Sequence, residues 1–170
     1  MKITPPQFIE GKDFRRMAVR ESGGVYRFKL LRDAVFIFDE LVVTPPVRLS
    51  FQVHGTEWMR IEPHRITISK FYSWNGNSPK KGILILGMDH WLGTPDFIPG
   101  TLTASLIHDS LFQFSFLRKM PFSCEHANEV YEQVCKANHF KLTGIYRSAL
   151  DEFSHEYWGK HQSYTTCHEI

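Results

Sequence analysis

The sequence lacks the features that would place a protein in a membrane or in an oxidising compartment. No stretch reaches the roughly 18 apolar residues that span a bilayer, and residues 1–6, MKITPP, lack the apolar run of a signal peptide. The three cysteines, Cys124, Cys135 and Cys167, form no CxxC pair, and an odd number cannot all be paired within one chain. We therefore expect reduced thiols, no membrane span and no secretion through a signal peptide.

The chain also lacks an excess of charge of either sign. It has 20 Lys and Arg residues against 18 Asp and Glu residues, which gives a formal net charge of +2 when its nine His residues are neutral. A protein that covers phosphates needs a strongly basic surface, so we expect no nucleic-acid partner. The sequence contains no internal repeat and no low-complexity tract.

What the chain does have is the length and apolar content of one globular domain, with 170 residues of which 42% are hydrophobic. Short runs of alternating apolar and polar residues follow one another in its first half, and this period of two is typical of strands with one wet face. The runs are 25–30, 35–38, 47–53, 58–61 and 65–72. An antiparallel meander is the simplest topology for them.

The periodicity changes in the second half of the chain. Leu102 to Lys119 is bounded by Pro-Gly before it and Pro121 after it, which are start and stop signals of a helix. Ser123 can cap a second helix, and the spacing of apolar residues predicts a third from Leu142 to Phe153. Strands followed by helices predict an α+β fold with three helices packed on one side of the sheet.

We therefore expect one domain over residues 1–170. Within it we expect an arm or tail over 1–20, strands over 21–76, a long loop over 77–100, the three helices over 101–159 and a tail over 160–170. The loop region holds one apolar run, 83–86, which predicts a buried strand.

His108 and Asp109 are two ionisable neighbours in the middle of the first predicted helix, which is apolar almost all round. Burial of an imidazole and a carboxylate costs several kcal/mol unless each has a partner. Adjacent residues on a helix point about 100° apart, so each needs partners from elsewhere. We expect amide groups of Asn75, in a turn, and of Asn128, on the second helix, to supply them.

The two ionisable residues have a structural and a functional interpretation. In the structural one, they form a satisfied polar clasp that ties the helix to its neighbours. In the functional one, His108 is a general base that activates water, and Asp109 is a metal ligand or an electrostatic partner. The candidate catalytic residues are then His108, Asp109, Asn128 and Asn75, and the candidate substrate-binding residues are Trp74, Gly76, Ser78, Trp91 and Tyr131.

Four motifs in sequence order resemble a phage and prophage family of unknown function. They are WNGNSPK at 74–80, GTPD at 93–96, ASLIHDSLFQF at 104–114, and Ala127-Asn128 with Tyr131. Members of that family read WDGxSPK, GTPDG, ASLVHDALYQF and then AD with an aromatic residue three positions on. The resemblance covers about residues 56 to 159. It implies a phage or prophage origin and an α+β fold, and it implies no established activity.

Two departures from this pattern bear on a metal site. The acids of WDG and AD are Asn75 and Asn128 here, so Asp109 alone of three carboxylates is kept. Hard cations such as Ca²⁺ depend on carboxylate ligands, so a divalent cation at Asp109 would need backbone carbonyls or other acids. The His-Asp pair also resembles, over a few residues, that of secreted phospholipases A2, where the His activates water and the Asp holds calcium; their calcium loop and disulfides are absent.

Two functions of different classes follow from these observations. The first is a virion or host-interaction protein whose His-Asp centre is inactive or weakly active, with a phage or host protein as partner and a homo-oligomer as a further option. The second is a hydrolase that uses His108 on a host lipid, peptidoglycan or other ester or amide. Neither requires a cofactor, although a Ca²⁺-type ion at Asp109 is compatible with the second. The expected location is the host cytoplasm or the phage particle.

Overall fold

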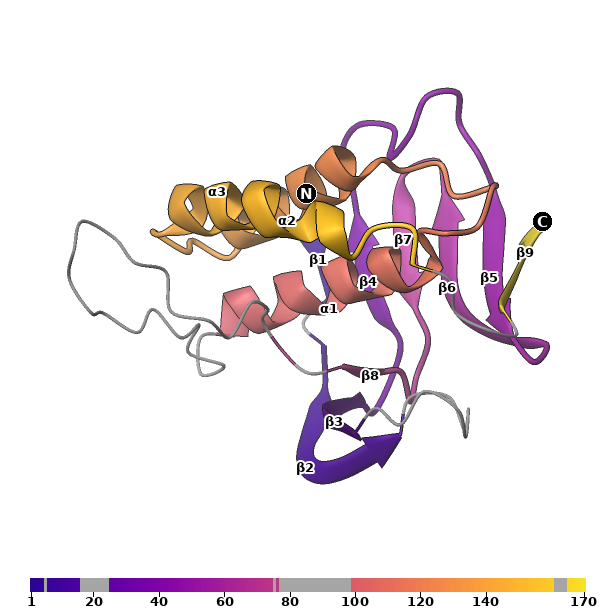
Figure 1. Ribbon diagram of the computed structural model, residues 1–170, viewed down its shortest axis with the longest axis horizontal. Coiled ribbons are helices and arrows are strands. Elements are labelled where there is room, and N and C mark those ends of the chain that lie inside the picture. The colour runs from indigo at the N-terminus through magenta and orange to yellow at the C-terminus, as the bar shows by residue number, and fades with distance from the viewer. Residues whose placement is uncertain (5, 16–24, 75, 77–98, 161–164) are drawn as a thin grey trace.

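The computed structural model describes residues 1–4, 6–15, 25–74, 76, 99–160 and 165–170. Its larger sheet has six antiparallel strands in the order β1-β4-β7-β6-β5-β9. The strands are β1 (Lys2–Ile3), β4 (Ala34–Ile37), β5 (Leu49–Val53), β6 (Thr56–Glu62), β7 (Arg65–Ile68) and β9 (Thr165–Glu169). The run β5-β6-β7 is a meander, and β4 joins it beside β7 (Figure 1).

Strands β4 and β7 of the larger sheet alternate between buried and more exposed residues. In β4, Ala34 and Phe36 are fully buried, whereas Val35 and Ile37 are partly exposed. The tight β5–β6 turn has positive φ at both His54 and Gly55, as a two-residue hairpin requires. The predicted wet face of the sheet is therefore the one on which Val35 and Ile37 lie.

A smaller sheet has three antiparallel strands in the order β2-β3-β8. Its strands are β2 (Phe8–Arg15), β3 (Val25–Leu30) and β8 (Ser73–Trp74). The rings of Phe8, Phe28 and Trp74 pack against one another with centroids 5.4 to 5.7 Å apart. This aromatic cluster is the core of the smaller sheet.

The helices are α1 (Pro99–Phe114), α2 (Cys124–Ala137) and α3 (Thr143–Phe153), and a 3-10 turn, η1 (Ser154–Glu156), follows α3. The predicted cap of the second helix is confirmed, because the Ser123 side chain accepts a hydrogen bond from His126 N at 3.1 Å. Figure 1 shows the helices gathered on one side of the larger sheet, with α1 next to it. In the packing order, α2 lies on α1 and α3 lies on α2.

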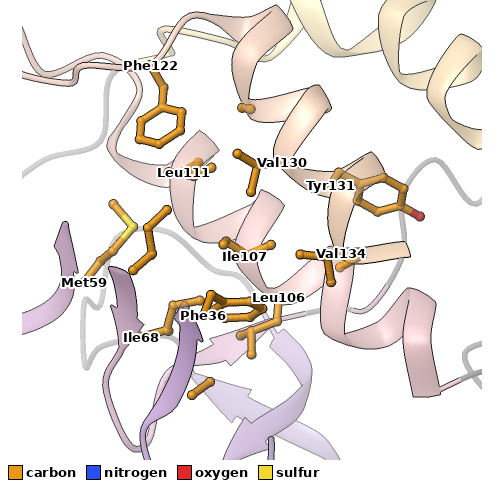
Figure 2. Packing of buried hydrophobic residues seen from close by; sticks show 14 of the residues in the cluster. Phe36, Met59, Ile68, Leu106, Ile107, Leu111, Phe122, Val130, Tyr131 and Val134 are labelled. Atoms are coloured by element: carbon orange, nitrogen blue, oxygen red, sulfur yellow. The ribbon is translucent and has the colours of Figure 1, made fainter. Parts of the chain in front are cut away.

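Helix α1 is buried on two sides. Figure 2 shows its residue Leu106 facing Phe36 of the sheet, while Val130 and Val134 of α2 lie on its other side. The ring of Phe114, at the end of α1, is 5.3 Å from that of Phe51 in β5. This double burial explains why α1 is apolar almost all round: it has a sheet on one side and a helix on the other.

The predicted α+β fold, with an antiparallel sheet in the first half and three helices in the second, is confirmed. Two terminal segments differ from expectation. The expected arm over 1–20 contains strands β1 and β2, and the expected tail over 160–170 contains β9, which pairs with β5 along its whole length. The backbone hydrogen bonds of these pairings come from partners far away in the sequence, which local periodicity does not reveal.

The structure also bears on the cysteines and on membrane-spanning helices. All three cysteines are free. Within the described ranges, no helix has both the length and the apolarity needed to cross a membrane. The expected strand at 83–86 lies outside the described residues.

Candidate functional site

His108 and Asn128 form the centre of the candidate site, between α1 and α2. The His108 side chain is buried, with 9% of the residue exposed, and Asn128 is fully buried. His108 Nε2 lies 2.9 Å from Asn128 Oδ1. The expected amide partner from the second helix is therefore present.

The Asn128 carboxamide is fixed in one orientation by its other bonds. Its Nδ2 donates to Asp151 Oδ1 at 2.9 Å and to Ser154 Oγ at 3.0 Å. The Asp151 carboxylate only accepts and therefore demands the nitrogen on that side, so the oxygen must face His108. Because an amide oxygen only accepts, His108 Nε2 carries the ring proton, and Nδ1 holds the lone pair of the neutral imidazole.

Aromatic rings enclose the His108 imidazole. The Phe112 ring is stacked on it with centroids 4.2 Å apart, and the Tyr131 ring meets it edge-on at 5.6 Å. The Trp158 ring packs on Phe112 in turn, with the two ring centroids 4.8 Å apart. The imidazole is therefore held in place by packing as well as by its bond to Asn128.

The electrostatic consequence is an imidazole that stays neutral. Burial lowers the pKa of His108 to about 4, and the hydrogen bond to Asn128 opposes this only in part. A neutral carboxamide cannot stabilise an imidazolium as a carboxylate would. His108 is consequently a weak base in this environment.

The carboxylate of Asp151 does not contact the His108 imidazole directly, because the Asn128 side chain lies between them. Asp151 on α3 accepts from Asn128, and both of its oxygens are 2.8 Å from Arg147 Nε. Arg147 also lies 3.5 Å from Glu132 of α2. The charge of Asp151 is thus balanced by an arginine and reaches His108 only through the Asn128 amide.

Ser154 joins a thiol to the same network. Its Oγ accepts from Asn128 and lies 3.1 Å from Cys124 Sγ. Burial raises the pKa of the Cys124 thiol above its ordinary value, so this sulfur is a thiol rather than a thiolate nucleophile. The network therefore connects α1, α2, α3 and η1 through His108, Asn128, Asp151, Ser154 and Cys124.

Asp109 lies on α1, directly after His108, at intermediate exposure. It raises the pKa of the Tyr131 phenol through its charge, although burial is the main cause of that upward shift. Among the described residues, no group of three or more His, Cys, Asp or Glu side chains could hold a metal ion. A cation at Asp109 stays a prediction.

The predicted substrate-binding residues are only partly brought together. Tyr131 contacts His108, as described above. Trp74 is fully buried and donates from Nε1 to Ser105 Oγ at 3.2 Å, one helical turn before Asp109. Gly76 is buried with a φ of 83°, a conformation that favours glycine. The predicted Asn75, Ser78 and Trp91 lie outside the described residues.

Sequence reasoning missed the outer part of the network. Arg147 and Asp151 have the i, i+4 spacing of a helical ion pair, which is a local signal. Nothing local indicates that Asp151 and Ser154 also face Asn128, because that depends on how α3 packs on α2.

The chain matches no family model, no curated protein and no solved structure. The resemblance to the phage family stays a prediction.

Proposed function

We propose that this chain is a phage- or prophage-encoded protein that acts by binding, as a virion component or as a ligand of a host protein. In this proposal the His108–Asn128 centre is a clasp that holds the three helices together. The observation that carries it is the hydrogen bond between the buried neutral imidazole of His108 and the neutral carboxamide of Asn128. The amide nitrogen of Asn128 in turn donates to Asp151 and Ser154. Such a centre contributes to packing specificity and gives little driving force for proton transfer.

The clasp has a direct test in the variant His108→Ala. Loss of the imidazole leaves Asn128 Oδ1 without its donor and opens a cavity beside Phe112 and Tyr131. We expect a loss of about 3 kcal/mol in unfolding free energy, measured by urea denaturation. An unchanged unfolding free energy would contradict the clasp.

The phage assignment is tested separately by mass spectrometry of particles purified from the phage or induced prophage that encodes the chain. Recovery at a fixed copy number supports a virion component. Absence from particles, together with capture of one host protein from infected cells, supports the host-interaction alternative. Absence of both would overturn the assignment.

A hydrolase is the second candidate, and one observation favours it. The bond to Asn128 fixes the tautomer in which His108 Nδ1 holds the lone pair that could take a proton from water. The variant His108→Gln removes this lone pair. If the wild-type chain cleaves a p-nitrophenyl ester and folded His108→Gln does not, the hydrolase is supported and the binding protein is not.

A further inference from the structure

Two neighbouring turns connect the smaller sheet with the larger one. We define the two-turn tip as residues 31–33, between β3 and β4, and residues 69–72, between β7 and β8. Leu30 N donates to Tyr72 O at 2.9 Å, Phe71 N donates to Leu30 O at 3.0 Å, and Lys70 N donates to Asp33 Oδ1 at 2.7 Å. The two turns therefore form one hydrogen-bonded unit.

Phe71 occupies an unfavourable position in this tip. Tyr72 N donates to Ser69 O at 3.2 Å, which makes Phe71 the third residue of a β-turn. Its φ is 72°, a value that favours glycine and is rare for a bulky side chain. The residue is only half-buried in return, because 49% of it is exposed. Strained residues that packing does not explain are concentrated at functional surfaces.

Cationic side chains surround the exposed ring. The ammonium groups of Lys70 and Lys29 lie 4.6 and 5.1 Å from the ring centroid. Leu31, in the adjoining turn, is 42% exposed, and Arg32 follows it. Among the described residues, two ammonium groups thus lie against the exposed Phe71 ring, and Asp33 accepts from the Lys70 backbone in the same tip.

The tip is displayed on a rigid support. Tyr72, directly after Phe71, is fully buried, and its hydroxyl lies 3.0 Å from Gln113 Oε1 of α1. Trp74 is likewise anchored to α1 through Ser105. A rigid aromatic side chain loses little conformational entropy when a partner binds, which is a property of binding hot spots.

We propose that the two-turn tip is a docking site for an acidic segment of a partner protein. An apolar side chain of that segment would pack on Phe71 and Leu31, and its carboxylates would pair with Lys29 and Lys70. Charge complementarity argues for an anionic occupant. A nucleic acid fits less well, because the whole chain has a formal net charge of only +2 and phosphate backbones need a strongly basic surface.

This inference rests on the proposed function, since it names the chemistry of the partner that a binding protein would take. The probe is a fluorescent random copolymer of glutamate and tyrosine, whose binding is followed by anisotropy at low salt. The test variants are Phe71→Gly, which suits the positive φ and removes the ring, and Lys70→Glu, which keeps the backbone bond to Asp33. Unchanged thermal unfolding confirms that both variants fold.

The matched control is Tyr157→Ser, because Tyr157 is 59% exposed and has the Lys160 ammonium 4.6 Å from its ring centroid. We expect the wild-type protein and Tyr157→Ser to bind the copolymer equally. Phe71→Gly and Lys70→Glu should each bind at least tenfold more weakly.

Three results would overturn the proposal: no binding of the copolymer by the wild-type protein, equal binding by Phe71→Gly, or an equal loss in Tyr157→Ser. Oligothymidine and vesicles of phosphatidylserine and phosphatidylcholine are tested in parallel. If either binds in a Phe71-dependent way and the copolymer does not, the occupant is a nucleic acid or a membrane. Ester cleavage that depends on His108 would refute the proposed function and leave these binding results unaffected.

Discussion

The imidazole of His108 and the carboxylate of Asp151 are linked by a single side chain, the carboxamide of Asn128, which donates to one and accepts from the other. The two ionisable groups thus belong to one hydrogen-bonded chain without touching. The phage-family motif that remains a prediction from the sequence has an acid at the position of Asn128. In this protein the carboxylate lies one step farther out, on α3, where Arg147 balances it.

Asn128→Asp is expected to destabilise the protein, although it introduces the acid of the predicted motif. The new carboxylate cannot donate to Asp151 or Ser154, and it would face the Asp151 carboxylate at about the 2.9 Å of the present bond. Loss of two donors and burial of a second negative charge should cost about 3 kcal/mol at pH 7. Urea denaturation measures the loss.

The double variant Asn128→Asp, Asp151→Asn is the control for this interpretation. It exchanges the acid and the amide, so the amide of the new side chain on α3 can donate to the new carboxylate on α2. At least half of the lost unfolding free energy should return. A double variant no more stable than Asn128→Asp alone would show that the bond between α2 and α3 is not the cause of the loss.

The pH dependence of stability should report the burial of His108. Its folded pKa of about 4 is below the ordinary value of 6.5, so the unfolded chain binds this proton first as the pH falls. The resulting contribution is fully present above pH 6.5 and is lost as the pH falls through the interval towards 4. It amounts to about 3 kcal/mol for a shift of this size.

His108→Gln isolates this contribution, because glutamine does not titrate and other ionisable groups are common to both proteins. The wild-type protein should lose more stability than the variant between pH 7.5 and 4.5, as measured by urea unfolding at each pH. Parallel curves for the two proteins would mean that His108 titrates near its ordinary pKa in the folded state.

The sequence predicts the centre of this network and not its outer part. Burial of His108 follows from an apolar helix in which every face is covered, and the Ser123 cap follows from residue type alone. Asn128 is predictable as a partner because it lies among apolar residues of the next helix. The roles of Asp151 and Ser154 depend on the packing of α3 against α2, a contact that no local pattern specifies.

Among the strands, too, the sequence predicts the local pairings and not the distant ones. The hairpin of β5 and β6 is predictable from alternation and a turn containing Gly55. The pairing of β9 with β5 joins Leu49 to Glu169 across most of the chain. The sequence of β9, TTCHE, has no apolar alternation. Its position is set by the free edge of β5, which is a property of the assembled sheet.

Tyr72→Phe should weaken the attachment of the smaller sheet to α1. The Tyr72 hydroxyl and Gln113 Oε1 form a buried hydrogen bond of 3.0 Å, and its removal leaves the Gln113 oxygen without this donor. A cost of about 1–2 kcal/mol is expected. The same change at the exposed Tyr157 should have almost no effect, so equal losses in the two variants would argue against a specific role of the bond.

His139→Gly should stabilise the end of α2. His139 follows the C-cap Asn138 with a φ of 58°, and the bonds from His139 N to Lys136 O and from Phe140 N to Cys135 O form a Schellman motif. Glycine adopts this conformation without a Cβ clash. The loss of this backbone strain should stabilise the folded state by more than the greater conformational entropy of glycine stabilises the unfolded chain. We expect a gain of about 0.5 kcal/mol in unfolding free energy, measured by thermal denaturation. His139→Val, which is bulkier at Cβ, should lose stability instead, and a gain there would show that the positive φ is not the cause.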